Sequence, residues 1–225
     1  MSIILGIETS TKICSVAVTD GNKLLALKEE GGDYSHSEKL TIFIQEVLKE
    51  ANLELVDVDA IAVSKGPGSY TGLRIGVSVA KGLCYALDKP LIAIDTLQAM
   101  ARNPSLKSTL YCSMIDARRM EVFTAIYDGG NNMVEPISAK IIDENSFSEV
   151  LNDNEIVFFG DGAAKCKEVL SGNSNAIFSE EGLPSAQYVN QLALKKFEKQ
   201  EFEDVAYFEP YYLKDFVATT PKKLL

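Results

Sequence analysis

One order of apolar segments occurs twice along the chain, and this repeat restricts the fold more than any other feature of the sequence. Each half begins with three strand-like runs and continues with helices that alternate with single buried strands. In the first half we predict strands at 3–7, 13–19, 24–27, 60–63 and 91–94 and helices at 35–51, 71–87 and 95–101. In the second half we predict strands at 109–115, 121–127, 134–142, 156–159 and 176–178 and helices at 146–151, 162–170 and 185–199. Because helical crossovers join parallel strands, the order βββαβαβα predicts two tandem α/β domains, each built on a mixed sheet.

The break at Asn103-Pro104-Ser105 separates the two halves. It gives an N-terminal domain of residues 1–103 and a smaller C-terminal domain of residues 104–225, which includes a C-terminal tail. Pro136 falls inside a predicted strand and therefore favours an edge position in the sheet. The tail is rich in aromatic side chains, and we expect it to pack onto the body of the protein through Tyr207, Phe208, Tyr211, Tyr212 and Phe216.

Composition and charge exclude several classes of protein. The hydrophobic fraction of 46% supplies a buried core, but the apolar runs are too short for a transmembrane helix. The N-terminal segment MSIILGIETST has no basic region, so we expect a cytoplasmic protein without a membrane partner. A net charge of −10 disfavours unaided nucleic-acid binding, because phosphate contacts need Lys and Arg. Four widely separated cysteines predict free thiols.

The first segment that could carry chemistry is Glu8-Thr9-Ser10-Thr11, between two predicted strands. Hydroxyls and backbone N–H groups in such a turn could bind phosphate, and the carboxylate could hold magnesium through water. An ordinary polar hairpin turn is the alternative, and the spacing alone favours it.

The second is the glycine-rich loop Gly66-Pro67-Gly68-Ser69, which opens a helix and so could cradle a phosphate. It is not a P-loop, because no Gly-Lys-Ser/Thr follows at the required spacing. It also lacks the dinucleotide fingerprint, since Thr71 stands where the third glycine would be.

The helix after this loop carries small residues at every fourth position, at Gly72, Gly76 and Ala80. Glycine in a helix interior costs about 1 kcal/mol relative to alanine, and close helix packing would offset that cost. Because the other faces are also largely apolar, we predict that this helix and the apolar stripe of the preceding one dock on a partner. Burial in the chain's own core is the alternative. The predicted interface comprises His36, Leu40, Phe43, Ile44, Val47, Tyr70, Thr71, Gly72, Arg74, Ile75, Gly76, Val79, Ala80 and Leu83.

The chain has one histidine, His36, near the start of the first long helix. A zinc motif with two histidines four residues apart would need a second histidine at the position of Leu40. We therefore predict no metal site and no catalytic residue, and we assign His36 a helix-cap or surface role.

Several motifs together resemble the TsaB (YeaZ) family, the bacterial partner subunits of the tRNA threonylcarbamoyladenosine machinery. They are Ile3–Ser10, His36-Ser37-Glu38, the specific run GPGSYTGLRIG at 66–76, and Asp116-Ala117-Arg118-Arg119. The resemblance spans most of residues 1–125 and continues loosely to 210–214. Tyr70 stands where the family usually has Phe, and Lys214 where it usually has Arg.

This resemblance implies duplicated ribonuclease-H-like domains of the actin-like ATPase superfamily. It implies a non-catalytic paralogue that docks on the catalytic subunit TsaD, which is joined by the ATPase TsaE, for N6-threonylcarbamoylation of adenosine 37 in tRNA. In TsaD a His-x-x-x-His helix motif binds a metal, and Leu40 breaks that motif here. The family likeness also makes Glu8–Thr11 a candidate vestigial phosphate loop. We expect no intrinsic cofactor, although weak nucleotide binding stays open, and tRNA contact only through the complex.

Two other classes remain open at this stage. One is an enzyme, either a metallopeptidase or a small-molecule kinase, and the missing second histidine and the short Gly160-Asp161-Gly162-Ala163 loop count against these. The other is a homodimeric binding module with no link to tRNA. A homodimer of the isolated chain through the same two helices also stays open.

Overall fold

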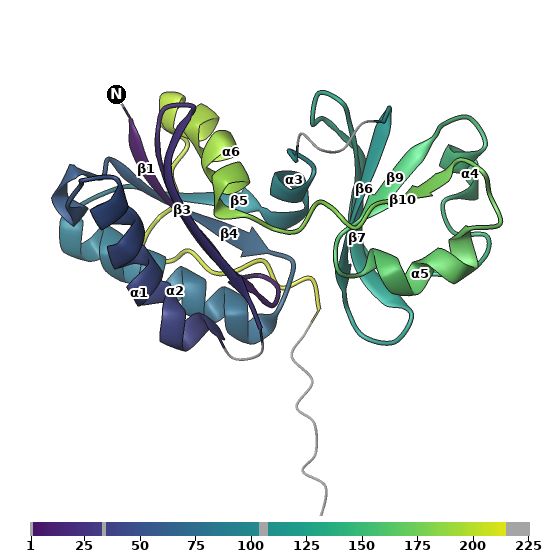
Figure 1. Cartoon of the computed structure of the whole chain (residues 1–225), viewed down its shortest axis with the longest axis horizontal. Helices are drawn as coiled ribbons and strands as arrows, with labels where there is room; N and C mark the ends of the chain where they lie inside the picture. Colours follow the sequence, from purple (N-terminus) through teal and green to yellow (C-terminus); the bar gives the residue numbers. More distant parts are fainter. Residues whose placement is uncertain (1, 33–34, 104–107, 215–225) are drawn as a thin grey trace, which may run out of the picture.

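The structure, a computed structural model, describes residues 2–32, 35–103 and 108–214 and consists of two lobes side by side (Figure 1). Each lobe contains a mixed five-stranded sheet, in the order β3-β2-β1-β4-β5 in the first and β10-β9-β6-β7-β8 in the second. In both sheets the first two strands of the repeat are antiparallel neighbours, and a parallel strand lies on the other side of the first. The predicted repeat of two mixed α/β domains is therefore confirmed.

The elements of the first lobe lie close to their predicted bounds. Its strands are β1 (Ile3–Glu8), β2 (Ile13–Asp20), β3 (Lys23–Gly31), β4 (Ala60–Gly66) and β5 (Leu91–Asp95). Its helices are α1 (Ser35–Glu50), the short 3-10 helix η1 (Leu55–Asp57), α2 (Tyr70–Leu87) and α3 (Thr96–Met100). Helix α2 begins after Ser69, whose hydroxyl accepts a hydrogen bond from the backbone N–H of Gly72, as an N-cap residue should.

The second lobe follows the same order with shorter helices. Its strands are β6 (Leu110–Asp116), β7 (Glu121–Asp128), β8 (Met133–Ile141), β9 (Ile156–Phe159) and β10 (Ala176–Phe178). The helices after β8 are α4 (Ser148–Leu151), α5 (Ala163–Leu170) and α6 (Ala186–Glu198). Strand β8, which contains Pro136, lies at the edge of its sheet as predicted.

The last helix does not pack in the domain to which the predicted division at residue 104 assigns it. Helix α6 follows the second lobe in the sequence, but it packs on the first sheet, on the face opposite α1 and α2 (Figure 1). Asn190 fixes it there, since its Nδ2 donates to Ile4 O (3.0 Å) and Ala17 O (3.2 Å). The first sheet is thus covered on both faces only because the chain returns to it.

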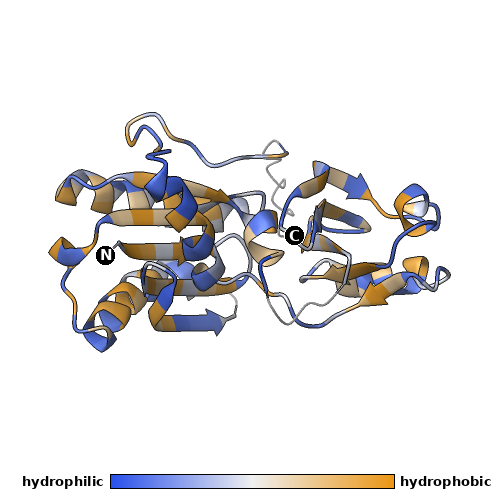
Figure 2. Cartoon of the chain, turned by 90° about the horizontal axis from the view of Figure 1, so that it is seen from above, coloured by the Kyte–Doolittle hydropathy of each residue, from blue (hydrophilic) through white to orange (hydrophobic). Residues whose placement is uncertain are grey.

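Apolar residues are frequent in the strands and alternate with polar residues along the helices (Figure 2). One cluster lies between the first sheet and helices α1 and α2, a second between this sheet and α6, and others lie in the second lobe and beside α3. Among the residues described, no helix combines the length and apolarity that crossing a membrane requires.

The tail returns to the first lobe after α6, as its aromatic residues predict. Glu203 N donates to Leu91 O (2.9 Å) and Tyr211 N donates to Lys65 O (2.7 Å), so the tail runs past two strands of the first sheet. Phe216 lies outside the described residues.

Candidate functional site

The turn after β1 is the most tightly enclosed polar segment of the first lobe. Glu8, Thr9 and Ser10 are fully buried, and Thr11 is nearly so. The Thr9 hydroxyl donates to Gly72 O (2.8 Å), and Ser69 N donates to Ser10 O (2.6 Å). The glycine-rich loop and the first turn of α2 therefore lie directly on the segment that was a candidate vestigial phosphate loop.

The glycines of α2 and of the loop before it allow this close approach. A Cβ atom on Gly68, Gly72 or Gly76 would lie closer than 3.0 Å to an atom of Ser10 or Thr9. Ala80, the next member of the stripe, is fully buried in the same core. The prediction that this small-residue stripe faces a partner is wrong, because the surface it packs against belongs to the chain's own first turn and sheet.

His36 closes the turn from the side of α1. Its Nε2 lies 2.7 Å from Thr11 O, and since a carbonyl oxygen only accepts, Nε2 carries the proton and donates. The buried Nδ1 has no hydrogen-bond partner among the described residues. His36 is thus a half-buried link between α1 and the first turn, and its predicted contact with a partner stays a prediction.

Glu8 carries a carboxyl group inside this closed turn. Burial raises the pKa of Glu8 above its ordinary value, although hydrogen bonds from Ser10 act in the opposite direction. Its Oε1 accepts from Ser10 N (2.6 Å), while Oε2 lacks a partner in the described part of the chain. A phosphate in this turn would have to displace the loop that covers it and would meet a buried carboxyl group.

The remaining predicted interface residues divide by exposure. Leu40, Ile44 and Val47 form the inner face of α1 and are buried in the chain's own core, so their predicted contact with a partner is wrong. The others remain accessible, fully or in part, on the outer surface of α1 and α2: Phe43, Tyr70, Thr71, Arg74, Ile75, Val79 and Leu83.

Helix α2 presents a polar and aromatic stripe outward, which we call the outer stripe: Arg74, Ser78, Lys81 and Tyr85. These positions recur at three- and four-residue intervals and therefore share one face of the helix. The side chain of Tyr85 is 88% exposed. Tyrosine and arginine are the residue types most enriched at energetically important interface positions.

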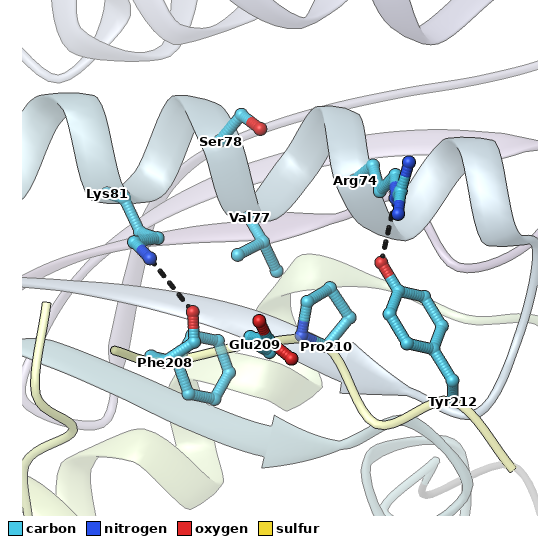
Figure 3. Close-up of a pocket in the computed structure, with 8 residues that line it drawn as sticks. All are labelled: Arg74, Val77, Ser78, Lys81, Phe208, Glu209, Pro210 and Tyr212. Carbon is cyan, nitrogen blue, oxygen red and sulfur yellow. Dashed lines mark hydrogen bonds between the residues drawn. The ribbon is translucent and has the colours of Figure 1, made fainter. Parts of the chain in front are cut away.

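The tail forms the second wall of a groove along this stripe (Figure 3). The groove has a volume of about 400 Å³ and is lined by Arg74, Val77, Ser78, Lys81, Phe208, Glu209, Pro210 and Tyr212. Lys81 Nζ donates to Ala206 O (3.1 Å) and Phe208 O (2.9 Å), and Arg74 Nε donates to Tyr212 Oη (3.1 Å). These contacts hold the tail against α2 and fix the Arg74 guanidinium 4.2 Å from the centre of the Tyr70 ring.

Neither the tail nor Tyr85 belongs to the interface predicted from the sequence. Tyr207, between the two residues that Lys81 binds, is 84% exposed and adds a second aromatic side chain beside the outer stripe. The four-residue spacing of Lys81 and Tyr85 would have indicated that these two residues share one face of the helix. The position of the tail beside α2 could not be predicted in this way, because it depends on contacts that form only in the folded chain.

A second groove, of about 480 Å³, lies where Ile13 and the end of β3 meet the segment before α6. Four carboxylates line it, from Glu29, Glu30, Glu180 and Glu181. In the described part of the chain, no cluster of three or more His, Cys, Asp or Glu side chains has a geometry that could hold a metal ion. The acidic lining would repel a nucleotide phosphate.

Comparison with known proteins gives one consistent family. Residues 30–225 match the family described as "TsaD: tRNA N6-adenosine threonylcarbamoyltransferase". The chain is 30% identical to the tRNA threonylcarbamoyladenosine biosynthesis protein TsaB of Escherichia coli (strain K12), over 96% of both chains. It is 40% identical, over 41% of this chain and 32% of the relative, to a tRNA N6-adenosine threonylcarbamoyltransferase of Bacillus thuringiensis (strain Al Hakam).

A solved structure agrees with these relatives. A Pseudomonas aeruginosa protein described as similar to peptidase YEAZ superposes with a TM-score of 0.83 at 26% identity, covering 95% of this chain and all of the other. The expected fold class, two tandem α/β domains that are each built on a mixed sheet, is thereby confirmed.

Proposed function

The chain belongs to the TsaB (YeaZ) proteins, the tRNA threonylcarbamoyladenosine biosynthesis proteins of the wider TsaD family, and we propose that its part in this biosynthesis is to dock on a TsaD-like catalytic paralogue. The paralogue transfers the threonylcarbamoyl group to adenosine 37, and a TsaE-like ATPase joins the pair. The tRNA is held mainly by the paralogue, in the cytoplasm.

The observation that carries this proposal is the outward face of α2 with its tail. Arg74 is already oriented by Tyr70 and Tyr212. Two exposed aromatic side chains lie close to Lys81 in the chain or in its contacts, because Tyr85 follows it by one helical turn and Tyr207 lies between the two residues that it binds. Pre-ordered side chains lose little conformational entropy on association, which favours a specific protein interface. A paralogue with the same fold offers helices equivalent to α1 and α2 as the matching surface.

The buried thiols and the single histidine of the chain favour a supporting role, in which the paralogue performs the catalysis. Burial raises the pKa of the Cys14 thiol to about 11 and that of the Cys84 thiol to about 12, so both thiols are protonated and poor nucleophiles at neutral pH. His36 has its Nε2 engaged by Thr11 O. These observations also count against the metallopeptidase alternative.

The test measures affinity for the purified TsaD-like paralogue. Replacing Tyr85 by alanine (Tyr85→Ala) should weaken binding about 10-fold or more, because truncation of a central interface aromatic costs about 2 kcal/mol. Ile141→Ala is the matched control, since Ile141 is 72% exposed at the end of β8 in the other lobe. Unchanged affinity of Tyr85→Ala would refute docking through α2.

The homodimer is the second candidate, and it uses the same face. Sedimentation equilibrium of the chain alone and with the paralogue distinguishes the two. A homodimer that persists in the presence of the paralogue would contradict the heterodimer.

A further inference from the structure

The turn between β6 and β7 carries two adjacent arginines in an unusual backbone conformation. Arg118 has φ of +74° and Arg119 has φ of +51°, both in the left-handed region. Asp116 holds the start of this turn, because its Oδ1 accepts from Arg118 N (2.7 Å). Two further backbone bonds, Glu121 N to Arg118 O and Ala117 N to Glu121 O (3.1 Å each), close it. The arginines therefore project from a well-bonded turn.

Neither arginine side chain has a partner within the described part of the chain, and both are exposed. The nearby lysines differ, because Lys165 pairs with Asp116 and Lys214 pairs with Glu121. The carboxylates of Asp116 and Glu121 are thus each paired with a lysine, while Asp161, whose Oδ1 accepts from Asp116 N (3.0 Å), adds one further acidic group beneath the turn. On a chain of net charge −10, these two exposed guanidinium groups form a local positive site that no residue in the described ranges satisfies.

The turn also adjoins the proposed docking face. Leu213 of the tail packs in the same apolar cluster as Ala117, the residue before Arg118. The preceding residue, Tyr212, contacts Arg74 of the outer stripe. The tail therefore connects the groove on α2 directly to the arginine turn, and a ligand held by a subunit docked on α2 would lie near both.

We propose that Arg118 and Arg119 contact backbone phosphates of the tRNA within the assembled complex. This inference rests on the proposed function. A guanidinium group offers paired N–H donors that match phosphate oxygens, and its charge persists at all physiological pH values. The acidic surface elsewhere repels RNA, so the chain alone binds it weakly and contributes through this turn only once the paralogue holds the tRNA.

The test uses the complete complex with Arg118→Asn/Arg119→Gly. Asn and Gly are the residues that best tolerate a left-handed backbone, so the double variant removes both charges without adding strain to the turn. Lys23→Ala/Lys195→Ala is the control, because it removes two exposed positive charges at sites far from the turn in the sequence. Binding of unmodified tRNA is measured at several salt concentrations, and assembly with the paralogue is measured separately.

We expect the arginine variant to assemble normally and to bind tRNA about 10-fold more weakly. The slope of log affinity against log salt concentration should decrease by the amount that corresponds to the loss of about one to two phosphate contacts. The lysine control should match the wild type. Equal tRNA affinity and salt dependence for the arginine variant and the control would overturn the inference. Weakened assembly of the arginine variant would overturn it as well, because the pair would then contact an acidic protein surface. Failure of the wild-type chain to assemble would instead contradict the proposed function.

Discussion

The turns after β1 and β6 occupy equivalent places in the two lobes, and each begins with a carboxylate at the end of its strand. Glu8 ends β1 and is fully buried beneath the glycine-rich loop, whereas Asp116 ends β6 and is largely exposed beside two arginines. The pKa of Glu8 is raised by burial. Burial also opposes ionisation of Asp116, but hydrogen bonds from Lys165 and Arg118 N outweigh it and lower the pKa. The same topological position is thus closed within the core in one lobe and exposed at the surface in the other.

Breaking the closed turn should have the largest effect. Gly76→Leu places a side chain where even a Cβ would overlap Thr9, so we expect a loss of about 3 kcal/mol or more in unfolding free energy. For a chain of this size the melting temperature falls by about 2–4 °C per kcal/mol. Thermal unfolding of the isolated chain measures this.

Gly82→Ala is the control on the same helix, because nothing lies within 4 Å of a Cβ at that exposed position. It should stabilise the chain by up to about 1 kcal/mol, since alanine is the better helix former. A Gly76→Leu protein that melts like the wild type but loses affinity for the paralogue would instead support the prediction that the stripe contacts a partner.

A smaller, pH-dependent effect should come from Glu8→Gln. Because the pKa of Glu8 is higher in the folded chain than its ordinary value of 4.5, its favourable contribution is complete below that value and is lost as the pH rises through the folded pKa. The wild type should therefore lose stability relative to Glu8→Gln between acidic and neutral pH. Urea unfolding at a series of pH values, with Glu168→Gln as an exposed control, tests this. A difference that does not change with pH would contradict it.

The smallest effect should come from the exposed turn between β6 and β7. Asp116→Asn removes the ion pair with Lys165, and the exposure of this pair limits the loss to less than about 1 kcal/mol at neutral pH. Because the pKa of Asp116 lies below its ordinary value of 3.8, this contribution is present above that value and disappears as the pH falls. Unfolding of the variant and the wild type should converge in acid. A loss as large as that of Gly76→Leu would show that the second turn is as important to the core as the first.

The sequence was sufficient for the elements and their order. Apolar runs predicted every strand and α-helix of the repeat to within a few residues, although not the 3-10 helix η1, and Pro136 correctly indicated an edge strand. These signals are local, because backbone conformation and turn chemistry depend mainly on neighbouring residues. The closure of the first turn was not predicted, since its contacts join Thr9 to Gly72 and Thr11 to His36 across long stretches of sequence.

Amino-acid sequence alone determined the duplicated α/β architecture, the family motifs and the fact that Gly72, Gly76 and Ala80 share one face of a helix. Periodicity states which residues lie on the same face, but it does not state what covers that face. Tertiary structure decided that the stripe packs on the chain's own first turn, that α6 returns to the first sheet, and that the tail borders α2. These outcomes depend on contacts between segments far apart in the chain, where shape and burial select the partner and no local preference specifies it.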